Sequence, residues 1–239
     1  MQCYLMIIVE TEGSEEEVME TTGELNPNHY PAQRAANAAR HYVNTRYGSP
    51  YKVFMLHKVH SGNAEDVANG RKYQLEISFQ EMLSNNTYKG SAEVLYPREG
   101  PGSPEVKVSC AELEAYHKTQ EEEALYQKLK TSVSMLSAQE LPDSHGRIEP
   151  DMEPLWSLGI VASSFIMLKE STEDTLYNMA QVGSVTQVFT ETVELKFDYL
   201  VLLHDMVSQE IIRWKLQFGW SPLGGVKVQQ MEKIPHRHT

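Results

Sequence analysis

Apolar and polar residues alternate strictly along most of the segment from residue 193 to residue 220. Every second position is apolar from Val193 to Tyr199 and again from Ile212 to Trp220. This period of two places successive side chains on opposite faces of a strand, one toward a core and one toward water. The pattern predicts two long strands joined by a polar connection at residues 204–210. A connection of this length between anchored strands is a common location for functional residues.

Two other segments have the pattern of a helix. The first helix is predicted to begin at Pro31, to carry alanines on one face, and to end at Gly48 and Pro50. The second, which is more apolar, follows Asp151 and ends at Ser171. A face of alanines lets a helix lie close against a sheet.

Each predicted helix is followed by four predicted strands. The first set covers residues 51–60, 72–82, 91–96 and 105–111, with a turn at residues 61–63, and the second covers residues 177–190, 193–203, 210–220 and 226–232. A helix followed by an antiparallel meander, occurring twice, predicts an α+β fold made of two similar units.

A charged helix is predicted between the two units. Thr119 and Glu122 match a capping box, and Lys128 and Lys130 place positive charge in the last turn. The predicted organisation is an acidic, disordered extension at residues 1–27, a first subdomain at 28–115, a connecting helix and linker at 116–149, a second subdomain at 150–233, and a tail at 234–239.

The charge and the cysteine content limit the classes of function. A formal net charge of −12 argues against binding to nucleic acid or to an anionic membrane, because phosphate recognition requires clustered Lys and Arg. No segment has the length of a membrane span. Only Cys3 and Cys110 are present, which favours a reducing, cytoplasmic setting over a disulfide-stabilised fold.

Motifs that indicate catalysis are absent from the sequence. It contains no Gly-x-Ser-x-Gly, no His-Glu-x-x-His and no glycine-rich phosphate loop. Cys110 lies in a strand pattern, which is typical of a small core residue. His236 and His238 fit a solvated tail better than a metal site. We therefore expect a binding protein that is not an enzyme and has no cofactor and no metal.

Four stretches of the chain resemble the latexin family of tandem cystatin-like proteins. They are HYPAQRAANAARHYVN at residues 29–44, AEVLYP at 92–97, STEDTLYNM at 171–179 and DYLVLLHDMVSQEIIRWKLQFGW at 198–220. The resemblance extends from about residue 28 to about residue 230. It implies two cystatin-like subdomains, each a helix packed on an antiparallel four-stranded sheet, joined by a connecting helix.

The resemblance also implies a function and a site. Family members inhibit A-type metallocarboxypeptidases, zinc enzymes whose funnel-shaped entrance they cover with loops near the subdomain junction. One glutamine on a hairpin comes closest to the zinc, and it corresponds here to Gln209. The neighbouring residues expected in the contact are His204, Asp205, Ser208 and Glu210. We expect the chain to be monomeric when free.

Two features depart from the family pattern, and two alternative functions remain open. Arg213 stands where the family commonly has a proline, which would stiffen a strand edge, and the acidic extension has no counterpart. A cystatin-type inhibitor of cysteine proteases is one alternative, but residues 181–183 are one residue short of Gln-x-Val-x-Gly and no Pro-Trp pair occurs. A structural matrix protein, like the family's eggshell member, is the other.

Overall fold

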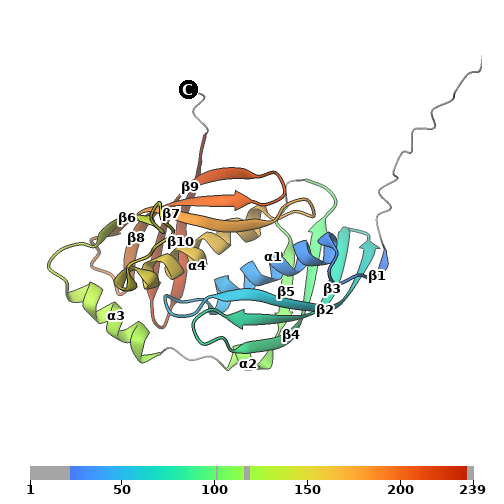
Figure 1. Cartoon of the computed structure of the whole chain (residues 1–239), viewed down its shortest axis with the longest axis horizontal. Coiled ribbons are helices and arrows are strands. Elements are labelled where there is room, and N and C mark those ends of the chain that lie inside the picture. The colour runs from blue at the N-terminus through green and yellow to red at the C-terminus, as the bar shows by residue number, and fades with distance from the viewer. Residues whose placement is uncertain (1–21, 101, 116–118, 236–239) are drawn as a thin grey trace, which may run out of the picture.

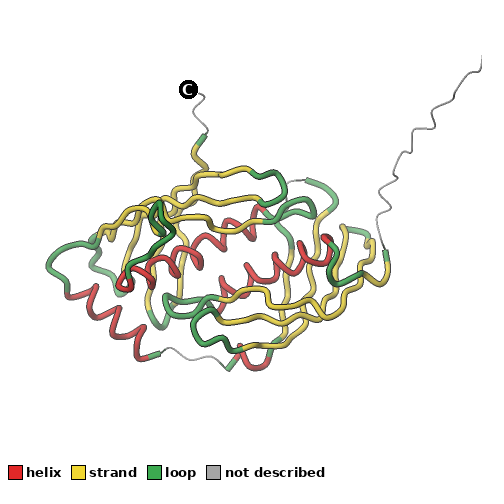
Figure 2. Tube along the Cα trace, viewed as in Figure 1, coloured by secondary structure: helices red, strands yellow, loops and turns green. Residues whose placement is uncertain are grey.

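The computed structural model describes residues 22–100, 102–115 and 119–235. Most of the acidic extension, together with Cys3, lies outside these residues, as do His236 and His238. Two long helices lie side by side at the centre, and two antiparallel sheets wrap around them from opposite sides (Figure 1; Figure 2). The predicted α+β class with two helix-and-sheet units is confirmed, but each sheet has five strands instead of four.

The first unit consists of helix α1 (Tyr30–Tyr47) and a sheet with the strand order β1-β2-β3-β4-β5. Its strands are β1 (Gly23–Leu25), β2 (Phe54–Val67), β3 (Gly70–Glu81), β4 (Thr87–Pro97) and β5 (Glu105–Ser109). The short helix α2 (Ala111–Glu114) follows the last strand.

Small side chains let α1 lie close to its sheet. Ala32, Ala35, Ala36 and Ala39 are fully buried, as the predicted alanine face requires. The sheet meets them with large apolar side chains, and these form one core cluster with the helix: Phe54, Ile77, Phe79 and Val94. Pro31 occupies the first turn of the helix, as predicted, where its missing N–H leaves no intrahelical bond unmade.

The second unit repeats this arrangement with larger side chains on the helix. Helix α4 (Glu153–Glu170) follows a short 3-10 turn, η1 (Pro150–Met152), and the strand order is β10-β9-β8-β7-β6. The strands are β6 (Ser137–Leu141), β7 (Tyr177–Val188), β8 (Leu195–Asp205), β9 (Glu210–Ser221) and β10 (Gly225–Ile234). Leu155, Leu158 and Ile166 of the helix share a core with Phe197 and Phe218 of the sheet.

The connecting helix α3 (Gln120–Thr131) packs on the second unit. The predicted capping box is confirmed: the Glu122 N–H donates to the Thr119 hydroxyl at 3.3 Å, and the Thr119 N–H donates to the Glu122 carboxylate at 2.8 Å. Tyr126 and Leu129 are buried in the second core. The Tyr126 hydroxyl also donates to the carbonyl of Val193, just before β8.

Three segments differ from the sequence prediction. Residues 61–63 do not turn the chain but continue β2, which is irregular between Val59 and Ser61. Strand β1 lies inside the segment predicted as the extension, and β6 lies inside the predicted linker. Both are short edge strands. Their own residues carry little pattern, because their order depends on the neighbouring strand that pairs with them.

Gly159 permits the close approach of α4 to its sheet. A Cβ built at this position lies 2.6 Å from Val182 Cγ2 and 3.2 Å from Tyr199 Cε2. Val182 is β-branched and fully buried, so its methyl group has little room to move.

Gly159→Ala is therefore expected to lower the free energy of unfolding by about 1–3 kcal/mol through overpacking. This outcome opposes the gain of about 1 kcal/mol that the same change gives in an exposed helix. Urea denaturation of both proteins measures the difference. An increase in stability would show that the contact with Val182 is not a constraint.

Candidate functional site

A short turn joins the end of strand β8 to the start of strand β9. Asp205 and Glu210 form the last pair of the β8–β9 ladder, and four residues from Met206 to Gln209 connect them. We call residues 204–210 the hairpin tip. The tip contains all five residues that the sequence singled out, which are close neighbours along the chain.

Asp205 holds the tip from inside. Its side chain is buried, and its Oδ1 accepts hydrogen bonds from the N–H groups of Leu176 (2.9 Å) and Val207 (3.2 Å). Its Oδ2 accepts from the Ser208 hydroxyl at 2.8 Å. Burial by itself would raise the pKa of Asp205, but the hydrogen bonds from Leu176, Ser208 and Val207 outweigh it and lower the pKa below its ordinary value. Asp205 and Ser208 therefore shape the tip from within.

Gln209 lies at the exposed end of the turn. Its φ of 62° is a left-handed conformation that few residues other than glycine adopt, and its N–H donates to the Asp205 carbonyl at 2.8 Å. Its side-chain Nε2 donates to the Met206 carbonyl at 2.6 Å. Among the residues that the structure describes, its Oε1 accepts no hydrogen bond, so that oxygen is available to a partner.

The remaining predicted residues lie beside the turn. His204 is half-buried on β8 and pairs with Ile211 across the hairpin, whereas Glu210 is exposed at the start of β9. Arg213 is exposed on β9. This strand lies between β8 and β10, so the expectation of a strand edge at Arg213 was wrong.

Apolar residues at the tip were missed by the sequence interpretation, which described this connection as polar. Met206 and Val207 are 45% and 43% exposed, and Ile211 is 38% exposed. The signal was present in the sequence, because turns favour Gly, Pro, Asn, Asp and Ser over two consecutive apolar residues. Exposed apolar side chains on a braced turn are typical of a protein-binding surface.

The segment before β7 fixes the tip to the rest of the molecule. The Leu176 N–H donates to Asp205 Oδ1, and the Leu176 carbonyl accepts from the Met206 N–H at 2.9 Å. Two residues further along, Asn178 Nδ2 lies 2.8 Å from the sulfur of Met206. Both backbone groups of Leu176, its N–H and its carbonyl, therefore hold the base of the turn.

The same segment also binds the first unit. The Tyr177 carbonyl accepts from Asn37 Nδ2 at 3.2 Å and from an Arg40 guanidinium nitrogen at 3.1 Å. Arg40 also donates to Asn178 Oδ1 at 2.7 Å. One short segment therefore joins α1 of the first unit to the tip of the second.

Glu173 adds a second attachment between the units. Its carboxylate accepts a hydrogen bond from the Tyr73 hydroxyl and lies 3.5 Å from Arg71 Nε. Its carbonyl accepts from Arg34 at 2.8 Å. Burial, followed by the contact with Glu173, raises the pKa of Tyr73, so the phenol remains a donor at neutral pH. These bonds fix the position of the tip relative to the first unit.

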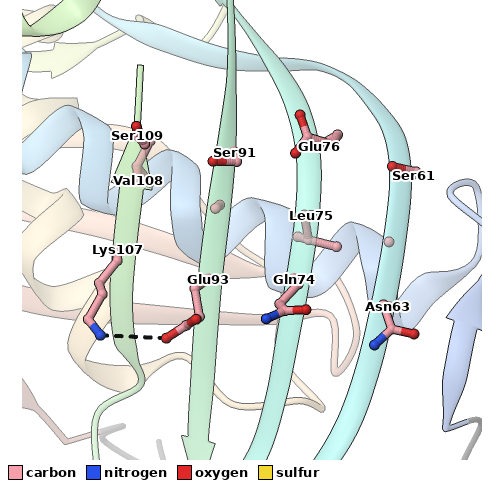
Figure 3. A pocket seen from close by; sticks show the side chains of 12 residues that line it. Ser61, Asn63, Gln74, Leu75, Glu76, Ser91, Glu93, Lys107, Val108 and Ser109 are labelled. Carbon is pink, nitrogen blue, oxygen red and sulfur yellow. Dashed lines mark ion pairs between the residues drawn. The ribbon is translucent and has the colours of Figure 1, made fainter. Parts of the chain in front are cut away.

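Other features of the described residues also bear on function. A hollow of about 560 Å³ lies on the outer face of the first sheet, where Glu93 is paired with Lys107 at 3.6 Å (Figure 3). Among the described residues, no three His, Cys, Asp or Glu side chains gather as a metal site would require. None of the described helices combines the length and apolar character of a membrane span. Cys110 is buried with its sulfur 3.5 Å from the Lys89 carbonyl, as a core residue.

These features define an α+β protein of two helix-and-sheet units that presents one braced hairpin. The sequence profile described as Latexin matches residues 25–238. Latexin from Mus musculus is 38% identical over 215 residues, which is 89% of this chain and 97% of that protein. Ovocalyxin-32 from Gallus gallus is 34% identical over 200 residues, covering 82% of this chain and 72% of that protein. The chain belongs to the latexin family.

A structural comparison adds a distant similarity. The crystal structure of mouse fetuin-B is 10% identical, covers 91% of this chain and 72% of its own, and has a TM-score of 0.27. A score this low adds nothing to the family assignment, which depends on the sequence relatives. The family profile begins at residue 25, the last residue of β1.

Asp205→Asn is expected to lower the free energy of unfolding at pH 7 by about 1–3 kcal/mol, because it removes charge-assisted hydrogen bonds at the base of the tip. The pKa of Asp205 is lower in the folded than in the unfolded chain. The stabilisation is therefore complete above the unfolded pKa and is lost as the pH falls through the folded pKa.

Denaturant titrations at pH 7 and at successively lower pH measure this difference. Asp198→Asn is the matched control, because Asp198 is an exposed carboxylate on the same strand whose only described hydrogen bond is from Gln217. The control is expected to change stability by less than about 0.5 kcal/mol. Equal effects of the two substitutions, or no dependence on pH, would contradict the role given to Asp205.

Proposed function

We propose that this protein inhibits zinc-dependent A-type metallocarboxypeptidases, with the hairpin tip covering the entrance to the active site. The observation that carries the proposal is the bracing of the tip, in which Asp205 and Leu176 hold the turn before any partner binds. Membership of the latexin family supports the class of activity. The protein acts by occlusion and contributes no catalytic group of its own.

Bracing matters because ordering a flexible loop opposes binding. Immobilising a mobile side chain costs about 0.5–1.5 kcal/mol, and ordering backbone adds to this. The N–H groups of Met206 and Gln209 at the tip, and of Leu176 beside it, are already bonded in the free protein. Less conformational entropy is therefore lost when a partner docks.

Gln209 supplies the polar contact closest to the zinc. A catalytic zinc keeps one position open for water or substrate, and a neutral amide offers both an acceptor and donors to the groups around it. With Nε2 bound to Met206, the Oε1 of Gln209 is the acceptor that faces the metal-bound water. His204 and Glu210 flank this contact on the two strands.

Apolar contact supplies most of the affinity. Met206, Val207 and Ile211 are exposed at the tip and lose their contact with water on docking. Burial of apolar surface favours association by about 25 cal/mol per Å² before the costs of ordering and desolvation are subtracted. The amide of Gln209 therefore contributes more to the orientation of the tip at the active site than to the affinity.

Titration of a carboxypeptidase A-type enzyme with this protein tests the proposal. Inhibition is expected at or below micromolar concentration. Met206→Asp is expected to weaken it about 100-fold or more, because the change places a charge in an apolar contact. Gln209→Ala is expected to weaken it about tenfold or less, since the remaining surface still occludes the site.

Leu223→Asp is the matched control. Leu223 is 85% exposed in the β9–β10 turn, at the opposite end of β9 from the tip. The same chemical change at that position is expected to leave inhibition unchanged. No inhibition at micromolar concentration would exclude the proposed target class, and equal losses at Met206 and Leu223 would exclude the tip as the contact.

The structure gives no support to inhibition of cysteine proteases through residues 181–183. These residues lie within β7, and Val182 is fully buried against α4 and β8. A segment in the middle of a sheet is not free to enter a protease cleft. A parallel assay with a papain-like enzyme is expected to show no inhibition at the concentrations that block the carboxypeptidase.

A further inference from the structure

A cavity of about 190 Å³ lies where the two units meet. Helix α1 and strand β2 line it from the first unit, and α4 and β7 line it from the second. Residues from both units are therefore needed to form it. It is separate from the exposed end of the hairpin tip, although its wall residue Asn178 contacts Met206.

Three polar atoms of its lining residues are buried without a hydrogen-bond partner within the described part of the chain. They are Arg40 Nε, His41 Nδ1 and Trp156 Nε1. Buried polar groups in folded proteins are nearly always bonded to protein, water or a bound group. The three residues that carry these atoms line one cavity, which points to an occupant that accepts hydrogen bonds.

The charge of Arg40 favours an occupant of the cavity that is an anion. Its side chain is 7% exposed, and its acceptors are neutral: the Tyr177 carbonyl, Asn178 Oδ1 and, at 3.8 Å, the sulfur of Met55. No carboxylate forms an ion pair with it among residues 22–100, 102–115 and 119–235. Burial lowers the pKa of Arg40 to about 10, so it is still charged at pH 7. A buried cation without a counter-charge is costly, and an anion in the cavity would relieve that cost.

His41 adds a polar atom without adding charge. Burial, and then the neighbouring Arg40, lower its pKa well below the ordinary value, so the ring is neutral. Asn37 Nδ2 lies 3.2 Å from His41 Nε2. The backbone of Tyr177 also forms a hydrogen bond with this ring, and the tautomer decides which ring nitrogen is the donor.

The rest of the lining suits an apolar ring. Met55, Met82, Met167 and Met179 line the cavity, and methionine sulfur makes favourable contacts with aromatic groups. Met55 and Met82 are 38% and 36% exposed, which places them on the solvent side. An apolar cavity of about 150 Å³ holds a benzene molecule, so this one has room for a single substituted ring.

We propose that this cavity binds a small aromatic monocarboxylate. The carboxylate lies against the Arg40 side chain beside Trp156, and the ring packs among the methionines. This proposal does not depend on peptidase inhibition, because neither its contacts nor its test involves the exposed face of the tip.

Titration of the ¹⁵N-labelled full-length protein with benzoate, benzyl alcohol and benzylamine tests the ligand class. The three probes share a ring and differ in charge. Benzoate is expected to shift the Trp156 indole N–H signal in a saturable way, with binding at least about tenfold tighter than for the other two probes. The indole signal is assigned with Trp156→Phe.

Arg40→Gln is expected to abolish saturable benzoate binding, and Arg34→Gln is the matched control. Arg34 is also a junction arginine on α1, but it bonds Glu173 and does not line the cavity. The control is expected to bind benzoate as the unaltered protein does. Equal binding of benzoate and benzyl alcohol, or no saturable shift with any probe, would overturn the proposal and assign the unpartnered atoms to ordered water. Because the probe comparison uses the unaltered chain, this result does not depend on the folding of a variant.

Discussion

The bond from the Arg40 guanidinium to the Tyr177 carbonyl is the interaction on which the arrangement of this molecule depends. Tyr177 begins β7, and the residues just before it hold the turn between β8 and β9. A buried guanidinium is costly to desolvate, so the bonds that Arg40 makes to the Tyr177 carbonyl and to Asn178 Oδ1 favour one geometry. Together with the bonds of Glu173 to Tyr73 and Arg34, these bonds hold the hairpin tip in place relative to the first unit.

The tip illustrates how an exposed surface can be rigid. Its outer side chains, Met206, Val207 and Gln209, contact solvent, whereas Asp205 bonds inward to Leu176. The exposed apolar residues are tolerated because the fold does not need them for its core, and they remain available to a partner. The braced turn supports the proposed inhibition over the alternative of a matrix protein, since occlusion needs a surface that keeps its shape.

Local pattern predicted the elements whose order is set by their own residues. The alanine face of α1, the capping box of Thr119 and the long strands β8 and β9 all follow from periodicity and capping chemistry. The edge strands β1 and β6 were missed, and residues 61–63 were predicted as a turn. These segments are extended because a neighbouring strand bonds their backbone groups, and the neighbour is distant in sequence.

By itself, the sequence determined the α+β class, the two helix-and-sheet units and the location of the tip, because hydrophobic periodicity specifies which face of each element is buried. Only the tertiary structure decided the surroundings of individual side chains. It turned the carboxylate of Asp205 inward, left Met206 exposed, and buried Arg40 beside a cavity without a counter-charge. Burial and hydrogen bonding of a single side chain depend on the elements packed around it, and those come from distant parts of the chain.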